Sequence, residues 1–226
     1  MPNAGFFKGR RLQAEIIKIN PNQPETKLVA YVAERIRAGQ VTGMPTDTFY
    51  GLAADPLNLR AVDKIYEVKS RSRHKPLSLL IESVDQAEEL AHPQSEIFYL
   101  LARKFWPGPL TMIVKAASGL PLKVTANTGN VALRVPAAEI PLAVIRAARV
   151  PITATSANVS GAKECTTAKG VQEQLGDRIP IIVDGGVSPR SVASTIVDLT
   201  DPDGRWSVQR EGAITRQELL DILGDA

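Results

Sequence analysis

The sequence predicts a single domain of the mixed α/β class, and three observations support this. Segments with helical periodicity and short apolar segments typical of strands alternate along the chain without a repeat period. No linker-like stretch rich in proline, glycine or serine divides the chain. Its 226 residues, of which 44% are hydrophobic, suffice for one substantial core. We therefore expect residues 25–226 to form the domain and residues 1–24, which are basic and then contain prolines, to lead into the first helix.

The predicted helices are segments in which apolar residues recur three and four positions apart. The first spans residues 25–38, and Gly39 follows it as a stop signal. The last begins with a capping box formed by Thr215 and Glu218 and ends at Gly224. The other predicted helices span residues 59–69, 84–90, 94–105 and 140–148.

The predicted strands are short apolar segments bounded by turn residues. Pro76 disfavours a helical conformation at Lys75, so the chain is expected to be extended there and to continue into a buried strand at 77–81. Trp-Pro-Gly-Pro at 106–109 is a breaker that precedes the next strand. The remaining predicted strands span residues 110–114, 131–135, 152–154, 181–183, 195–199 and 206–210.

The composition favours a soluble cytoplasmic protein and excludes several kinds of site. A single cysteine, Cys165, excludes an internal disulfide and favours a reducing compartment. With two histidines besides, the chain cannot form a zinc site without carboxylates, so we expect no protein-bound metal. No apolar segment reaches the roughly 20 residues of a membrane span, and the N-terminus lacks the apolar run of a signal peptide. The net charge of +3 permits a polyanionic partner but is common among cytosolic enzymes.

Two clusters in the first third of the chain combine hydroxyl groups with cations. Residues 42–52, Thr-Gly-Met-Pro-Thr-Asp-Thr-Phe-Tyr-Gly-Leu, place hydroxyls and one carboxylate around a proline turn. Further along, Lys69, Arg71, Arg73 and Lys75 are spaced by two, which directs all four to one side of an extended segment. Cations without a neighbouring acid fit phosphate binding, and a solvated basic loop is the alternative. Together the clusters suit a small molecule that carries both carboxylate and phosphate.

Two later segments could also contact such a ligand. Arg134 lies within an otherwise apolar strand, where a buried guanidinium needs either a structural carboxylate or a bound anion as its partner. Residues 151–161 run from a strand into small polar residues that can approach a nucleotide closely. The alternative is a plain helix cap by Ser156 or Asn158. The sequence contains no Gly-x-x-x-x-Gly-Lys-Ser/Thr motif, which excludes a P-loop nucleotide site.

Eight motifs in their order along the chain resemble the YrdC-like family, in particular its bacterial threonylcarbamoyl-AMP synthases. They extend from about residue 25 to 220. The resemblance implies a twisted, open, mixed sheet with helices packed around it and a basic concave face, in the short single-domain form of the family. The motifs are Pro-Thr-Asp-Thr-Phe-Tyr-Gly-Leu (45–52), Lys-Ser-Arg (69–71) with Pro76-Leu77, Trp-Pro-Gly-Pro-Leu-Thr (106–111), Val-Ala-Leu-Arg-Val-Pro (131–136), Thr-Ser-Ala-Asn (155–158), Asp-Gly-Gly (184–186), Ser-Thr-Ile (194–196) and Arg-x-Gly (210–212).

The resemblance also implies an activity. Enzymes of this type are nucleotidyltransferases that convert L-threonine, bicarbonate or CO2, and ATP into threonylcarbamoyl-AMP and pyrophosphate. This is the first step of the threonylcarbamoyl-adenosine modification of tRNA, and partner proteins then transfer the group. The resemblance implies Mg2+ accompanying ATP, no covalent protein nucleophile, and no role for a membrane.

Residue roles follow from the same resemblance. Thr48, Arg134 and Ser194 would bind threonine, with Arg134 meeting its carboxylate, while Lys69 and Arg71 would stabilise charge on the triphosphate. Ser72 departs from the proline of many relatives, and Lys75 aligns with a variable position. The residues expected to contact ATP are Lys69, Arg71, Lys75, Asn130, Ser156, Asn158 and Arg210.

Two alternative functions account for part of the pattern. In the first, an RNA-binding protein, the cations at 69–73 would contact backbone phosphates. This leaves the hydroxyl-rich residues 46–48 and 153–160 without a role, and aromatic residues form only 5% of the chain. The second alternative is a divergent family member without synthase activity, which the intact motifs at 69–71 and 156–158 disfavour.

Overall fold

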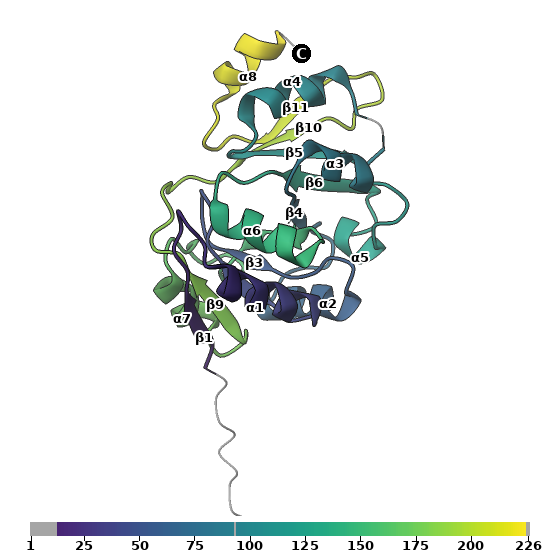
Figure 1. Ribbon diagram of the computed structural model, residues 1–226. Helices are drawn as coiled ribbons and strands as arrows, with labels where there is room; N and C mark the ends of the chain where they lie inside the picture. The colour runs from purple at the N-terminus through teal and green to yellow at the C-terminus, as the bar shows by residue number, and fades with distance from the viewer. Residues whose placement is uncertain (1–12, 93, 225–226) are drawn as a thin grey trace, which may run out of the picture.

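A computed structural model describes residues 13–92 and 94–224, which form two mixed β-sheets flanked by helices (Figure 1). The mixed α/β class is therefore confirmed, but the strands are divided between two hydrogen-bonded sheets rather than joined in one. The first sheet contains, in spatial order, β1 (Glu15–Lys18), β9 (Ile181–Asp184), β2 (Thr42–Met44), β3 (Gly51–Ala53) and β8 (Thr155–Ser156). The second contains β11 (Ser207–Arg210), β10 (Thr195–Asp198), β5 (Leu110–Lys115), β6 (Asn130–Arg134), β4 (Ser78–Leu80) and β7 (Ile152–Thr153).

The two sheets meet where one segment passes directly between them. β7 pairs with β4 of the second sheet, and β8, which starts two residues later, pairs with β3 of the first. Two backbone hydrogen bonds reinforce the junction, from Thr153 N–H to the Ala54 carbonyl at 2.9 Å and from Ala154 N–H to the Ser78 carbonyl at 2.8 Å. The sequence predicts a single strand at 152–154, whereas the chain changes sheets at Ala154.

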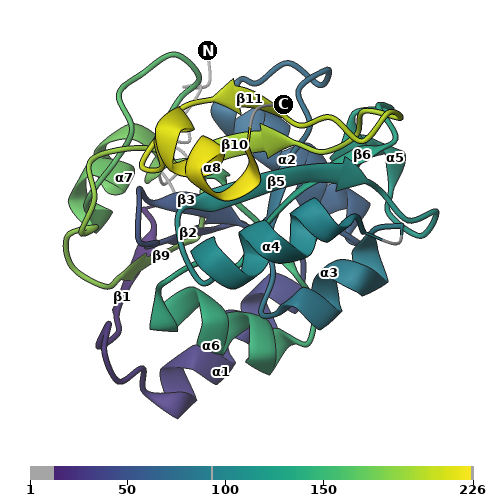
Figure 2. The same cartoon turned by 90° about the horizontal axis from the view of Figure 1, so that it is seen from above.

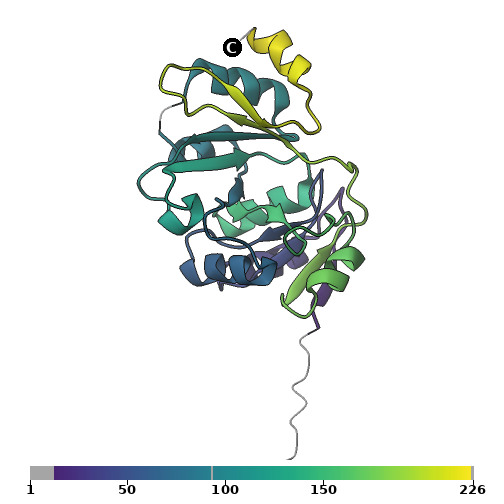
Figure 3. The same ribbon diagram turned by 180° about the vertical axis from the view of Figure 1, so that it is seen from behind.

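The predicted helices are confirmed with ends that differ by at most two residues. The capping box of Thr215 and Glu218 is present. Figure 2 shows α1 and α6 packed side by side, and α7 and α8 lie at opposite ends of the molecule in Figures 1 and 3. The confirmed helices are α1 (Thr26–Arg37), α2 (Leu59–Lys69), α3 (Val84–Leu90), α4 (Glu96–Phe105), α6 (Glu139–Ala148) and α8 (Arg216–Leu223), and the structure adds α5 (Leu122–Thr125) and α7 (Ala168–Leu175).

The predicted lead-in at 1–24 contains a strand that the sequence analysis did not identify. β1 pairs in parallel with β9, and Ile17 and Ile19 are buried in a core shared with α1 and α6. Residues 15–19 are therefore part of the folded unit, while residues 1–12 lie outside the described part of the chain. Within the described residues, no helix combines the length and apolar character needed to cross a bilayer.

Candidate functional site

A cavity of about 300 Å³ lies between the two sheets. Side chains two positions apart on β4, β5 and β6 line it, because alternate residues of a strand point to the same face. Ser194 and Ile196, at the start of β10, line it as well. The turn between β2 and β3, the β7–β8 junction and the loop after α2 complete the wall. The polar and charged side chains that line the cavity are Thr46, Thr48, Tyr50, Arg71, Ser78, Thr111, Arg134, Thr155, Ser156, Glu164, Ser194 and Arg210.

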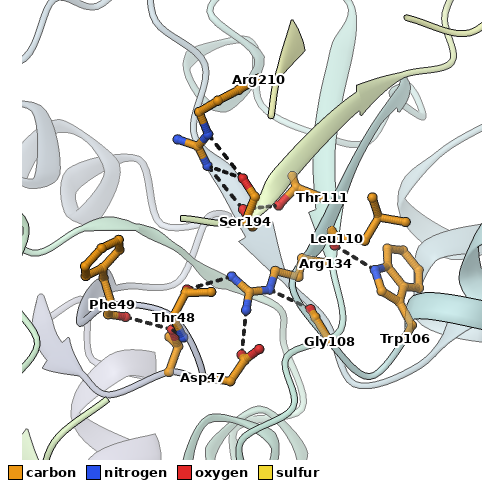
Figure 4. A network of polar contacts seen from close by, with 11 residues as sticks. Asp47, Thr48, Phe49, Trp106, Gly108, Leu110, Thr111, Arg134, Ser194 and Arg210 are labelled. Carbon is orange, nitrogen blue, oxygen red and sulfur yellow. Dashed lines mark hydrogen bonds and ion pairs between the residues drawn. The ribbon is translucent and has the colours of Figure 1, made fainter. Parts of the chain in front are cut away.

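Arg134 lines this cavity and is almost fully buried (Figure 4). Its guanidinium donates to Asp47 Oδ1 at 2.5 Å, to Thr48 Oγ1 at 3.0 Å and to the Gly108 carbonyl at 2.9 Å. Burial lowers the pKa of Arg134, and the negative charge of Asp47 opposes this shift. The partner of this buried arginine is therefore a structural carboxylate, Asp47, which is itself only 3% exposed.

Ser194 and Arg210 form a second polar group beside Arg134 in the same view (Figure 4). The Ser194 hydroxyl lies 2.9 Å from Thr111 Oγ1. Arg210 Nη2 donates to the Ser194 carbonyl at 2.8 Å and to its hydroxyl at 3.2 Å. Thr111 on β5, Ser194 just before β10 and Arg210 on β11 thus come together from separate motifs. Thr48, Arg134 and Ser194 all line this cavity.

Lys69 is placed differently from the prediction, since it does not line the cavity and is only 2% exposed. Its ammonium donates to the Asn158 carbonyl at 2.8 Å, to Asn158 Oδ1 at 2.9 Å and to the Ser156 carbonyl. Ser156 Oγ in turn donates to Asn158 Oδ1 at 2.7 Å. Lys69 and Asn158 therefore lie behind the segment that presents Ser156 to the cavity.

The four cations between residues 69 and 75 do not share one side, so that prediction is wrong. Lys69 is the last residue of α2, and the residues after it form an irregular loop rather than an extended segment. Arg71 lines the cavity and donates to the Pro76 carbonyl at 3.0 Å. Arg73 instead forms an exposed ion pair with Asp63, and Lys75 is exposed outside the cavity.

Asn130 also lies away from the cavity lining. It begins β6, whereas Arg134 ends the same strand, so their backbones are roughly 13 Å apart at about 3.3 Å per residue. Of the residues predicted to contact ATP, Arg71, Ser156 and Arg210 line the cavity.

Sequence reasoning did not assign Tyr50 or Glu164, which also line the cavity. The Tyr50 hydroxyl donates to the Gly186 carbonyl at 2.6 Å and accepts from Gly185 N–H at 3.3 Å, which ties the Asp-Gly-Gly turn to the cavity wall. Burial raises the pKa of Tyr50 to about 12, so it remains a hydrogen-bond donor at neutral pH. Tyr50 lies within a recognised motif that could have indicated it, whereas nothing in the local sequence indicated Glu164.

We expect the stability of the protein to depend on pH through Lys69. Burial, assisted by the charge of Arg71, lowers the pKa of Lys69 from 10.5 to about 8. Between these two values the unfolded chain binds the extra proton, so the penalty for the buried charge disappears as pH rises through this window. The free energy of unfolding of the wild type relative to Lys69→Met should increase by up to about 3 kcal/mol. Urea unfolding at pH 7 and pH 10 measures this change, and an equal difference at both values would contradict it.

Comparisons with known proteins place this chain among proteins of similar sequence and fold. Residues 34–212 match the Sua5–YciO–YrdC family, described as telomere recombination. The chain is 37% identical over 212 residues to the threonylcarbamoyl-AMP synthase of Pyrococcus abyssi, covering 93% of this chain and 61% of that protein. It is 38% identical over 208 residues to the threonylcarbamoyl-AMP synthase of Bacillus subtilis, covering 92% and 59%.

The fold agrees with a solved structure of the same group. The crystal structure of P. abyssi Sua5 complexed with L-threonine aligns with a TM-score of 0.89 at 36% identity, covering 93% of this chain and 61% of that one. The chain thus spans about six-tenths of the length of these relatives. Because the family match extends over most of the sequence, the resemblance to YrdC-like proteins is confirmed, and the chain belongs to the Sua5–YciO–YrdC family.

Proposed function

We propose that this protein synthesises threonylcarbamoyl-AMP from L-threonine, bicarbonate or CO2, and ATP, with release of pyrophosphate. The observation that carries the proposal is the cavity between the sheets, in which Arg71, Arg134 and Arg210 converge with several hydroxyl groups. Thr48, Arg134 and Ser194 offer groups suited to an amino acid, and Arg71, Ser156 and Arg210 offer groups suited to phosphates. The names of the P. abyssi and B. subtilis relatives support the same reaction.

Threonine would bind at the end of the cavity formed by Thr48, Arg134 and Ser194. Arg134 has five N–H donors, and three of them are engaged by Asp47, Thr48 and Gly108. The two remaining N–H groups would donate to the carboxylate of the amino acid, because Asp47 neutralises the charge of the guanidinium but accepts from only one of its N–H groups. The threonine complex of the P. abyssi relative supports this class of ligand.

ATP would extend toward Arg71, Ser156 and Arg210, which line the cavity. Lys69 and Asn158 would act from behind by fixing the segment that carries Ser156. Mg2+ bound with ATP would neutralise charge that develops on the phosphates.

The reaction needs no covalent protein nucleophile. The threonine amine attacks carbon dioxide or bicarbonate, and an oxygen of the resulting carbamate attacks the α-phosphorus of ATP as pyrophosphate leaves. The protein would supply orientation and fixed positive charge, which can provide a large part of a barrier reduction. We further propose that the reaction takes place in the cytoplasm and that partner proteins transfer the group to tRNA.

The RNA-binding alternative is disfavoured because the cations of the basic segment point in different directions. Lys69 is buried and Arg73 is paired with Asp63, so they do not form a continuous surface for a phosphate backbone. A direct tRNA contact elsewhere on the surface remains compatible with the synthase.

The proposed function is tested by incubating the purified protein with labelled bicarbonate, ATP and Mg2+, and with threonine, serine or no amino acid. Label should enter an AMP-linked product only when threonine is present. Absence of label, together with salt-sensitive RNA binding by the same sample, would favour the RNA-binding alternative instead.

Replacing Ser194 with alanine is expected to raise KM for threonine about tenfold, or ~1.4 kcal/mol, while KM for ATP changes less. The reason is that the Ser194 hydroxyl lies in the group next to Arg134 and would contact the amino acid. Steady-state kinetics with each substrate varied in turn measure both constants. Ser118→Ala is the matched control, because Ser118 is exposed and outside the cavity. Equal increases in the two KM values would argue against a threonine contact.

A further inference from the structure

In the loop at 70–76, which lies wholly within the described residues, Arg71 is the charged side chain that lines the cavity. Among the described residues its guanidinium makes one hydrogen bond, from Nη2 to the Pro76 carbonyl of the same loop at 3.0 Å. Its buried Nε has no partner there. The direction of the Arg71 side chain therefore depends on how the loop is attached to the rest of the molecule.

Two side chains of α2 attach this loop to the fold. Residues 72–76 form hydrogen bonds or ion pairs with other parts of the described chain at two points. The Tyr66 hydroxyl donates to the Lys75 carbonyl at 3.0 Å, and Asp63 forms an ion pair with Arg73. The Arg73 guanidinium also lies over the Tyr66 ring, 5.8 Å from its centroid. The placement of the loop beyond Arg71 therefore depends on Asp63 and Tyr66.

The same two residues also contact α5. Asp63 Oδ2 accepts from Lys123 Nζ at 2.6 Å, and the Tyr66 hydroxyl lies 3.1 Å from the Lys123 carbonyl. A phenol has one hydrogen, so the carbonyl groups of Lys75 and Lys123 share it. Tyr66 is buried, and burial raises its pKa, so the hydroxyl keeps this hydrogen at neutral pH. The loop and α5 are thus attached to α2 by the same two side chains.

We propose that Tyr66 and Asp63 are positioning residues that hold the loop so that Arg71 faces the phosphates of ATP. This inference rests on the proposed function. Neither side chain lines the cavity, so both act through Arg71 rather than on the substrate. Tyr66 contributes more than Asp63, because its hydroxyl is buried, whereas the ion pairs of Asp63 are partly exposed and screened by salt.

The test is calorimetric titration of ATP with Mg2+ into the full-length protein, using wild type, Tyr66→Phe and Asp63→Asn. Tyr66→Phe removes the donor from two carbonyl groups and should weaken ATP binding about fivefold. Asp63→Asn should weaken it about threefold. Loss of a negative charge by itself would strengthen the binding of an anion, so the direction of this change distinguishes positioning from a charge effect. Threonine affinity should change less than about twofold in both variants.

Matched controls remove the same groups far from the loop in sequence. Tyr31→Phe removes a hydroxyl that donates to Glu15 at 2.9 Å, and Asp203→Asn breaks an exposed ion pair with Arg205. Neither Tyr31 nor Asp203 lines the cavity. Both variants should therefore bind ATP with near wild-type affinity.

The variant Arg71→Ala tests whether the effect passes through Arg71. In that background Tyr66→Phe should not weaken ATP binding further, because the group that Tyr66 positions is absent. If Tyr66→Phe weakens ATP binding by the same factor with and without Arg71, or weakens threonine binding equally, Tyr66 supports the fold in general and the positioning role is overturned. Unchanged ATP affinity in Tyr66→Phe, or stronger ATP binding by Asp63→Asn, overturns it as well. If the wild type does not bind ATP, the proposed synthase function itself fails.

Discussion

Replacing Asp47 with alanine is expected to lower the free energy of unfolding by about 3–5 kcal/mol. Asp47 and Arg134 form an ion pair at 2.5 Å, and both side chains are less than a tenth exposed. Removal of the carboxylate leaves a buried guanidinium with hydrogen bonds to Thr48 and Gly108 but no counter-charge. The loss therefore includes the cost of an uncompensated buried charge, which exceeds the value of the pair itself.

Urea unfolding of three variants checks this expectation. Asp177→Ala removes an exposed aspartate and should change stability by no more than about 0.5 kcal/mol. The double variant Asp47→Leu with Arg134→Met removes both charges and should recover much of the loss, because the desolvation penalty disappears with the pair. If Asp47→Ala costs no more than Asp177→Ala, the pair is not a structural element of the site.

Six helices of the described residues could be predicted because each contains its own signal, whereas α5 and α7 were missed. In α2, apolar residues recur at helical spacing, and Asn58 caps the first turn by accepting from the N–H groups of Arg60 and Ala61. The strands β1, β2 and β3 have three or four residues each and lack a distinctive alternation. They exist because distant partners complete them, as when β1 pairs with β9 near the other end of the chain. Such pairing is a tertiary effect that no local pattern reports.

The residues of the candidate site could likewise be predicted only in part. Family motifs indicated Thr48, Arg134, Ser194 and Arg210, and the structure brings these residues to one cavity. The identity of the anionic partner of Arg134 remained open in the sequence, because Asp47 lies 87 residues away. The orientation of the Lys69 side chain was predicted wrongly for a physical reason. Residues two positions apart point to the same side only on an extended chain. Here α2 continues through Lys69, and the left-handed Ser70 then redirects the loop.

In the proposed synthase reaction, replacing Lys69 with methionine is expected to lower kcat/KM for ATP about 100-fold, or ~2.7 kcal/mol. Methionine matches the length of the buried chain but supplies no donor to the two oxygens of Asn158 and the Ser156 carbonyl. Buried acceptors without a donor carry a desolvation penalty, so the segment should shift and withdraw Ser156 from the cavity.

Kinetics and threonine binding together distinguish this positioning role from general damage to the fold. Lys69 makes no hydrogen bond to the group that would hold threonine, so threonine affinity measured by calorimetry should change less than threefold in Lys69→Met. Lys64→Met, an exposed change on the same helix, should leave both quantities near wild type. If threonine affinity falls by as large a factor as kcat/KM for ATP does, Lys69 stabilises the whole cavity rather than only the residues proposed to bind ATP. A selective loss on the ATP side would instead show that a lysine hidden from the ligand controls where the phosphates bind.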